Sequence, residues 1–278
     1  MPQITTPDGV KLHYEEAGSG TPIVFVHEFA GDLRSWDPQL SHFSRRYRCI
    51  AYNARGYPPS DVPGSFEQYS QELARDDVLA VLDGLKIQRA FIVGLSMGGL
   101  ATLHFGMKYS ARALGLVAAG AGYGAVPAQR EEFQRSSRAN AELMLKEGMA
   151  KFAATYGHGP TRLQLRDKDP RGFALYIKYL SEHSPKGSAN TMLGCQARRP
   201  SLYDLKKEIA GITAPLLVIA GDEDDPTLEP GLMIKRALPK AGLAVLPRSG
   251  HALNLEDPAL FNRLVEDFFR QVESGRWA

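Results

Sequence analysis

Short apolar runs alternate along the chain with longer stretches in which apolar residues recur at helical spacing. The runs predict buried strands at 22–26, 48–52, 90–95, 113–119, 215–220 and 243–246. The spaced stretches predict helices near 36–43, 70–85, 231–237 and 258–272, and an alternating stretch predicts an opening hairpin at 3–17. Strands joined by such helices indicate βαβ units, so we expect an α/β fold: a mostly parallel central sheet with helices on both faces.

The alternation of predicted strands and helices is interrupted once. From about 126 to 207 the chain has no convincing buried strand, only helical stretches such as 131–149 and 173–180. We interpret 126–207 as a helical cap inserted into the sheet domain, with 1–125 and 208–278 forming the two parts of the core. The alternative is that these helices decorate one edge of the sheet.

The composition is that of an ordinary globular protein, with 44% hydrophobic and 23% charged residues. Thirty-three basic and 31 acidic side chains give a formal charge of +2, and the lack of a long basic run argues against a nucleic-acid partner. The first residues lack the basic and apolar blocks of a signal peptide, and no apolar run approaches ~18 residues. We therefore expect a cytoplasmic protein without a membrane partner. Most soluble oligomers are symmetric dimers, so a homodimer is the assembly to test.

Neither the cysteines nor the histidines are spaced as metal ligands. Cys49 lies in an apolar run and Cys195 in a polar stretch far along the chain, so we expect two plain thiols. His27-Glu28 lacks the second histidine of His-Glu-x-x-His and follows a strand instead of lying on a helix. We expect no metal and no cofactor.

The residues around Ser96 carry the strongest chemical signal. An apolar strand runs into Gly94-Leu95-Ser96-Met97-Gly98 and then into a helical pattern, which predicts a nucleophile elbow on a sharp strand-to-helix turn. Side chains in place of Gly94 and Gly98 would collide across such a turn. The helix beginning near Met97 directs free N–H groups and its positive end to the place where an oxyanion would form. The alternative is a glycine-rich turn with an idle serine.

A serine hydroxyl needs a base within hydrogen-bond reach and a carboxylate that orients the base. His251 follows the last predicted strand, in a loop from which a base could reach Ser96, whereas the other histidines that we considered suit surface or packing positions. The acid should follow a strand between the two. The acidic loop after the preceding strand offers Asp224 as our choice, with Asp225 and Asp222 as alternatives.

These motifs resemble those of the alpha/beta-hydrolase fold superfamily, and the likeness runs from the opening strands to the last helix. It implies that Ser96 is the nucleophile, that the Gly-x-x-Asp pattern ending at Asp224 supplies the acid, and that Gly250-His251 supplies the base. Within the superfamily the chain is most similar to enol-lactonases acting on 3-oxoadipate lactone and to cofactor-free haloperoxidase or perhydrolase-type esterases. The stretches that carry this likeness are 36–40, 53–56, 95–99 and 250–256.

The chain departs from these families at two turns. They usually carry His-Gly after the third strand, where this chain has His27-Glu28, with Phe29 placed to give a second oxyanion N–H beside that of Met97. We expect the Glu28 carboxylate to face solvent. The alternative is that it points into the site, touches substrate or catalytic water, and acts as an extra acid or base after burial raises its pKa. The second departure is the turn at 57–60, which we expect to line the pocket differently.

The resemblance implies a serine hydrolase that cleaves an ester or lactone of a small molecule through an acyl-enzyme intermediate. Serine instead of aspartate at the elbow disfavours dehalogenase and epoxide hydrolase chemistry. Two alternatives stay open: carbon–carbon bond hydrolysis of a dienoic acid, and a non-catalytic ligand-sensing module on the same fold. For the first, Arg198-Arg199 would hold a substrate carboxylate bidentately, although adjacent arginines on a helical cap are usually solvated. Tyr123, in the glycine-rich turn after the strand at 113–119, is a further candidate for substrate contact.

Overall fold

Eight strands in the described part of the chain, residues 1–277, join into one sheet. In this computed structural model they are β1 (Gln3–Thr5), β2 (Lys11–Ala17), β3 (Thr21–Val26), β4 (Tyr47–Tyr52), β5 (Ala90–Leu95), β6 (Ala113–Ala119), β7 (Leu216–Gly221) and β8 (Gly242–Leu246). Their order across the sheet is β1-β2-β4-β3-β5-β6-β7-β8. The β1–β2 and β2–β4 pairs are antiparallel and the other pairs are parallel. The predicted hairpin and mostly parallel sheet are confirmed.

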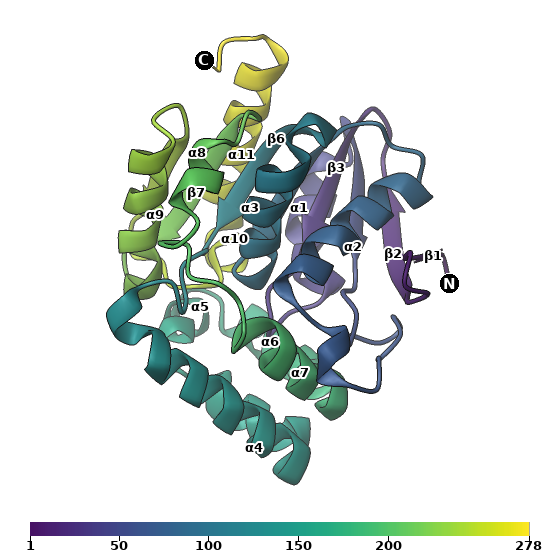
Figure 1. Cartoon of the computed structure of the whole chain (residues 1–278), viewed down its shortest axis with the longest axis vertical. Helices are drawn as coiled ribbons and strands as arrows, with labels where there is room; N and C mark the ends of the chain where they lie inside the picture. The colour runs from purple at the N-terminus through teal and green to yellow at the C-terminus, as the bar shows by residue number, and fades with distance from the viewer. Residues whose placement is uncertain (278) are drawn as a thin grey trace.

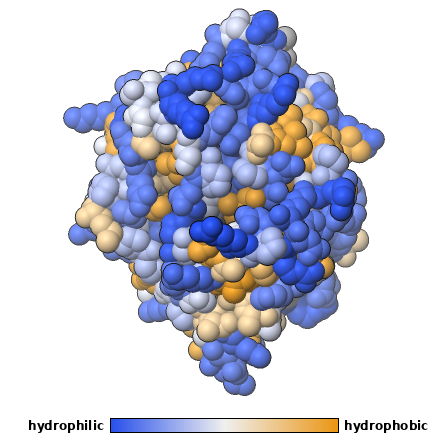
Figure 2. All heavy atoms as spheres, turned by 180° about the vertical axis from the view of Figure 1, so that it is seen from behind, coloured by the Kyte–Doolittle hydropathy of each residue, from blue (hydrophilic) through white to orange (hydrophobic). Residues whose placement is uncertain are grey.

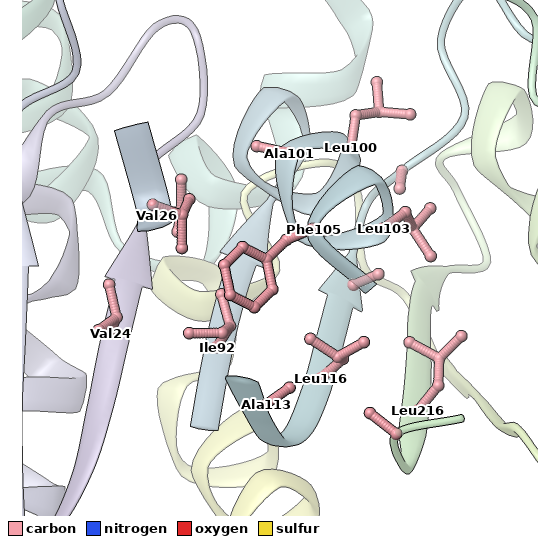
Figure 3. Close-up of a cluster of buried hydrophobic side chains, with 14 of the residues drawn as sticks. Val24, Val26, Ile92, Leu100, Ala101, Leu103, Phe105, Ala113, Leu116 and Leu216 are labelled. Atoms are coloured by element: carbon pink, nitrogen blue, oxygen red, sulfur yellow. The ribbon is translucent and has the colours of Figure 1, made fainter. Parts of the chain in front are cut away.

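Helices cover both faces of this sheet (Figure 1). One apolar cluster packs α2 (Gln71–Gly84), α3 (Met97–Tyr109), α8 (Lys206–Ala210) and α9 (Asp225–Ala237) against one face. A second cluster packs α1 (Asp37–Phe43), α10 (Leu253–Glu256) and α11 (Pro258–Glu273) against the other. Figure 3 shows α3 lying over the strands, with Phe105 directed toward Ile92. Burial on both faces explains why the central strands are continuous apolar runs in the sequence.

The helix predicted near 231–237 begins earlier, at Asp225. Pro226 lies in its first turn, where a missing N–H costs no intrahelical hydrogen bond, so the proline starts the helix instead of delaying it. This difference matters for the site, because Asp224 becomes the residue that immediately precedes α9.

Between β6 and β7 the described chain contains helices and no strand. Residues 127–200, which we call the helical insertion, include α4 (Arg130–Tyr156), α5 (Leu163–Lys168), α6 (Pro170–Ser181) and α7 (Pro185–Asn190). The α4 helix is kinked at Gly148, whose φ of 80° is readily adopted only by glycine. Figure 1 shows α4 to α7 gathered at one end of the sheet.

The helical insertion lies over the carboxyl ends of the parallel strands. Its apolar side chains share a buried cluster with Phe29, Met97 and Ala252, which lie beyond the ends of β3, β5 and β8. In open α/β sheets, ligands bind at this edge. The division into domains at 126 and 207 stays a prediction.

Neither the surface nor the two cysteine thiols indicate a further reactive site. The face shown in Figure 2 carries separate apolar patches between polar side chains. In residues 1–277, none of the helices combines the length and the apolar character needed to cross a membrane. Cys49 and Cys195 are free and buried, and burial raises the pKa of Cys49 to about 12 and that of Cys195 to about 11.

Candidate active site

Ser96 sits where the fully buried strand β5 ends and α3 begins. Its φ of 55° is in the left-handed region, which is strained for a residue with a side chain. The Ser96 N–H donates to Ala119 O at 2.8 Å and ties the turn to β6. A Cβ at Gly94 or Gly98 would overlap backbone carbonyl groups, so both positions require glycine. The local sequence therefore builds the sharp turn that its motif predicts.

Ser96, His251 and Asp224 form one chain of hydrogen bonds. His251 Nε2 lies 2.7 Å from Ser96 Oγ, and His251 Nδ1 lies 2.6 Å from Asp224 Oδ2. The carboxylate that reaches the imidazole thus belongs to Asp224, whereas Asp222 accepts a hydrogen bond from the Ser249 N–H. An ionised Asp224 keeps the proton on Nδ1 and leaves Nε2 free to accept from the serine.

Asp224 is buried and held by three side chains. Burial alone would raise the pKa of its carboxyl, but the charge and hydrogen bond of His251 and the hydroxyl of Tyr123 lower it overall. Tyr123 donates to Asp224 Oδ1 at 2.8 Å, and its ring meets the His251 ring edge-on with centroids 4.7 Å apart. The Thr227 hydroxyl lies 2.9 Å from the Asp224 carbonyl oxygen and 3.2 Å from Oδ2, so it can donate to either acceptor. The hydroxyl of Tyr123, which we considered for substrate contact, is therefore engaged by Asp224.

The loop that carries His251 is held by groups that the sequence patterns did not bring forward. The two carboxylate oxygens of Glu256 accept from the N–H groups of Gly250 at 2.6 Å and Ala252 at 2.8 Å, on either side of the histidine. The His251 N–H donates to Thr161 O at 3.0 Å, in the helical insertion. In the sequence, residues 250–256 were noted only because they resemble a motif of related families. The spacing of residues does not reveal which N–H groups the Glu256 carboxylate reaches.

The peptide units around Phe29 are fixed in direction. His27 Nε2 accepts from the Ala54 N–H at 3.0 Å, so Nδ1 carries the proton and donates to Glu28 O at 2.6 Å. Burial lowers the pKa of His27 to about 4 and keeps it neutral. In a trans peptide the Glu28 carbonyl and the Phe29 N–H point in opposite directions, so this N–H points away from His27. The Phe29 carbonyl accepts from the Tyr57 hydroxyl at 2.8 Å, so this residue of the divergent turn supports Phe29.

The N–H groups of Phe29 and Met97 make no hydrogen bond to any other protein group between residues 1 and 277. Met97 is the first residue of α3, where N–H groups lack intrahelical partners and the helix dipole is positive. Both residues belong to the buried cluster beneath the helical insertion. The two N–H groups expected to bind an oxyanion are therefore available to an acceptor.

Glu28 does not face solvent, so that expectation was wrong. Its side chain is 2% exposed, and Oε2 lies 2.5 Å from Nη2 of Arg162, which is also 2% exposed. Burial disfavours the charged form of Arg162, but the Glu28 carboxylate nevertheless shifts its pKa well above the usual value. The pair joins the turn after β3 to the helical insertion. Arg162 belongs to no motif, so only the folded chain reveals it as the partner that makes burial of Glu28 possible.

The structure separates the adjacent arginines at 198 and 199. Arg198 is exposed and lies over the Phe66 ring, in keeping with a solvated arginine. Arg199 is 4% exposed, so the solvated interpretation is wrong for this residue. Its guanidinium carbon lies 5.0 Å from the centroid of the Phe133 ring. The two arginines follow the π-helical turn at Thr191–Gln196, and the first side chain is exposed while the next is buried.

The family follows from comparison of this chain with known proteins. A sequence model of the alpha/beta hydrolase family matches residues 23–264, which is most of the chain. The chain belongs to this family. This alpha/beta hydrolase is 27% identical to a putative 2-succinyl-6-hydroxy-2,4-cyclohexadiene-1-carboxylate synthase of Bacillus subtilis, with 97% of this chain and 98% of the relative covered. It is also 27% identical to 3-oxoadipate enol-lactonase 1 of Acinetobacter baylyi, with 97% of each chain covered.

Solved structures of relatives share the whole fold. A thermophilic esterase from Thermogutta terrifontis, with malate bound, superimposes on this alpha/beta hydrolase with a TM-score of 0.85 at 26% identity, covering 98% of each chain. The fold and the family resemblance predicted from the motifs are confirmed, and the named relatives support hydrolase activity.

Proposed function

We propose that this protein is a serine hydrolase that cleaves an ester or lactone of a small molecule through an acyl-enzyme intermediate. The observation that carries the proposal is the hydrogen-bonded chain from Ser96 through His251 to Asp224. A base within reach of the serine, itself oriented by a buried carboxylate, is the arrangement that activates a hydroxyl group. Relatives named as an enol-lactonase and an esterase support the choice of bond.

In the proposed reaction, Ser96 Oγ attacks the substrate carbonyl carbon while its proton passes to His251 Nε2. The negative charge moves to the carbonyl oxygen, to which the N–H groups of Phe29 and Met97 donate. Collapse of this intermediate breaks the carbon–oxygen bond, and the imidazolium gives its proton to the leaving oxygen. Water then attacks the acyl-enzyme with His251 as base and releases the acid. Asp224 orients the imidazole and stabilises its charged form.

The helical insertion would act as a cap on this reaction. Thr161 and Arg162 contact the His251 loop and Glu28, and the apolar residues of the insertion pack beside Phe29 and Met97. A cover of this kind excludes bulk water and strengthens the electrostatic interactions beneath it.

We expect Tyr123→Phe to lower kcat about tenfold or more with little change in KM, because it removes a hydrogen bond to the ionised Asp224. The pKa of Asp224 should rise without that hydroxyl, so the acid side of the pH–rate profile should move to higher pH. Tyr203→Phe is the matched control, since Tyr203 donates to Glu229 at 2.6 Å outside this site. Profiles that shift equally in both variants, or in neither, would contradict this role of Tyr123.

Labelling with a serine-directed organophosphonate tests the proposal without knowledge of the natural substrate. Intact-protein mass should show one adduct on the wild type and none on Ser96→Ala or His251→Ala. The exposed His158 provides a control, because His158→Ala should be labelled like the wild type. If the folded wild type takes up no label, the proposal fails and the result favours the alternative of a non-catalytic ligand-sensing module.

Carbon–carbon bond hydrolysis would draw on the same three side chains, so labelling does not separate it from ester cleavage. A substrate panel with a short-chain ester, a lactone and a dienoic acid makes that distinction. We expect turnover of the ester or lactone; turnover of the dienoic acid alone would select the other reaction.

A further inference from the structure

One short segment of the helical insertion contacts three of the loops at the strand ends. It consists of residues 160–168, which we call the bridging segment, and comprises a 3₁₀ turn and the helix α5. The three loops follow β3, β7 and β8 and carry Phe29, Asp224 and His251. Each of these loops leaves a different strand, so the sheet alone does not fix the positions of the loops relative to one another.

The backbone that leads into His251 rests on the bridging segment. The Thr161 carbonyl accepts from the His251 N–H at 3.0 Å. A Cβ at Gly250 would lie 2.7 Å from the same carbonyl oxygen and would overlap Gln164 Oε1, so this close approach requires glycine. The bridging segment therefore supports the base of the candidate active site through its backbone.

The bridging segment also contacts the loop that carries Asp224. Gln164 Nε2 donates to Glu223 Oε2 at 2.5 Å, and Glu223 is the residue before the acid. The Glu223 N–H donates to Ser249 O at 3.0 Å, which joins the acid loop to the base loop. Lys168 Nζ lies 3.3 Å from Ser249 Oγ and provides a further contact with the base loop. One helix thus contacts both of the loops whose side chains must meet.

A buried ion pair holds the bridging segment in place. Arg162 follows Thr161 directly, and its guanidinium pairs with Glu28, the residue before Phe29. Both side chains are buried, so separating them would leave two charges without a partner. Leu165, in α5, is buried in the same apolar cluster as Phe29. The position of Thr161 and Gln164 against the two catalytic loops is therefore tied to the turn after β3.

We propose that Arg162 and Gln164 are positioning residues, through which the helical insertion holds the base and acid loops in place. The inference rests on the proposed function and gives the insertion a role beyond the exclusion of water. Neither side chain has to touch the substrate for this role. A misplacement of a reacting group by about 1 Å can lower a rate about 100-fold, so small movements of the bridging segment should be visible in kcat.

An exchange of two side chains tests the contact of Gln164. Gln164→Glu places a second carboxylate against Glu223, and the repulsion should lower kcat for 4-nitrophenyl acetate about tenfold with little change in KM. Addition of Glu223→Gln restores the hydrogen bond with donor and acceptor exchanged, so kcat should return close to the wild-type value. Glu182→Gln is the control. It removes the ion pair with Arg34 at 2.7 Å, another contact between the insertion and the core, and should match the wild type.

An apolar double variant separates positioning from stability at the ion pair. Glu28→Met with Arg162→Met leaves no buried charge without a partner, so the chain should stay folded. The bridging segment nevertheless loses its attachment to the turn after β3, so kcat should fall about 10- to 100-fold. A folded double variant with the kcat of the wild type would overturn the role of Arg162. Failure of Glu223→Gln to restore kcat in Gln164→Glu would overturn the role of Gln164.

A proton NMR measurement keeps this test separate from that of the proposed function. The Nδ1 proton that His251 shares with Asp224 should give a downfield signal in the wild type, and this signal should be absent from His251→Ala. It should shift or broaden in Gln164→Glu and return when Glu223→Gln is added. If no ester is hydrolysed, the proposed function fails while the NMR signal still tests positioning. A signal that is identical in the wild type and in Gln164→Glu would contradict the proposal.

Discussion

Replacement of Ser96 by alanine is expected to lower kcat/KM for ester hydrolysis by about 10⁴- to 10⁶-fold. Without Oγ no acyl-enzyme forms, and only the N–H groups of Phe29 and Met97 remain to stabilise attack by water. His251→Ala should lower kcat/KM by a similar factor. The double variant should lose no more than either single variant, since the two side chains act in one step.

A chromogenic short-chain ester followed under steady-state conditions measures this loss. Ser274→Ala is a suitable control, because Ser274 is exposed near the end of α11 and its hydroxyl donates only within that helix. Its activity should equal that of the wild type. If Ser96→Ala instead kept most of the activity, another group would have to attack the substrate and the proposed role of Ser96 would be withdrawn.

The second large effect is expected on stability. Glu28→Gln should lower the free energy of unfolding by about 3–5 kcal/mol, because it leaves the buried Arg162 without its counter-charge. Arg162→Met should be comparably destabilising, since it leaves the buried Glu28 carboxylate unpaired. The double variant Glu28→Met with Arg162→Met should recover most of the loss, since apolar side chains of similar size need no counter-charge. Urea unfolding of the three variants, followed by circular dichroism, measures these differences.

An exposed ion pair supplies the matched control for that experiment. Arg46 Nη1 lies 2.7 Å from Glu266 Oε1, but the Arg46 side chain is 65% exposed. Arg46→Ala should therefore lower the free energy of unfolding by less than about 1 kcal/mol. A loss in Glu28→Gln no larger than this would mean that water reaches the Glu28–Arg162 pair. Failure of the double variant to recover would assign the effect to packing instead of charge.

The Ser96 turn and the ends of the strands could be predicted because they depend on local rules. Continuous apolar runs mark strands buried on both faces, and glycines at 94 and 98 mark a turn that no larger residue fits. His251 and Asp224 could be proposed because parallel strands bring their carboxyl ends to one edge of a sheet. Within the acidic loop, the hydrogen bond to His251 selects Asp224 over its neighbours.

Partners of buried polar groups could not be predicted in this way. The sequence marks Glu28 as unusual after a strand but contains no sign that Arg162 would meet it, and it offers adjacent arginines without showing which one turns inward. The hydrogen bonds between Glu256 and the His251 loop, and the hydrogen bond from Tyr123 to Asp224, could not be predicted either, because these partners are brought together only by the folded chain.

The sequence by itself thus determined the α/β framework and the strained serine turn, because each follows from steric and periodic constraints within a few residues. It also indicated the two loops from which a base and an acid could reach Ser96, and left more than one carboxylate open in the second loop. The tertiary structure alone decided which charges are buried and which of them are paired. That outcome depends on how the helical insertion lies over the strand ends, where segments more than a hundred residues apart in the chain come into contact, as Glu28 and Arg162 do. Local patterns carry no information about such a meeting.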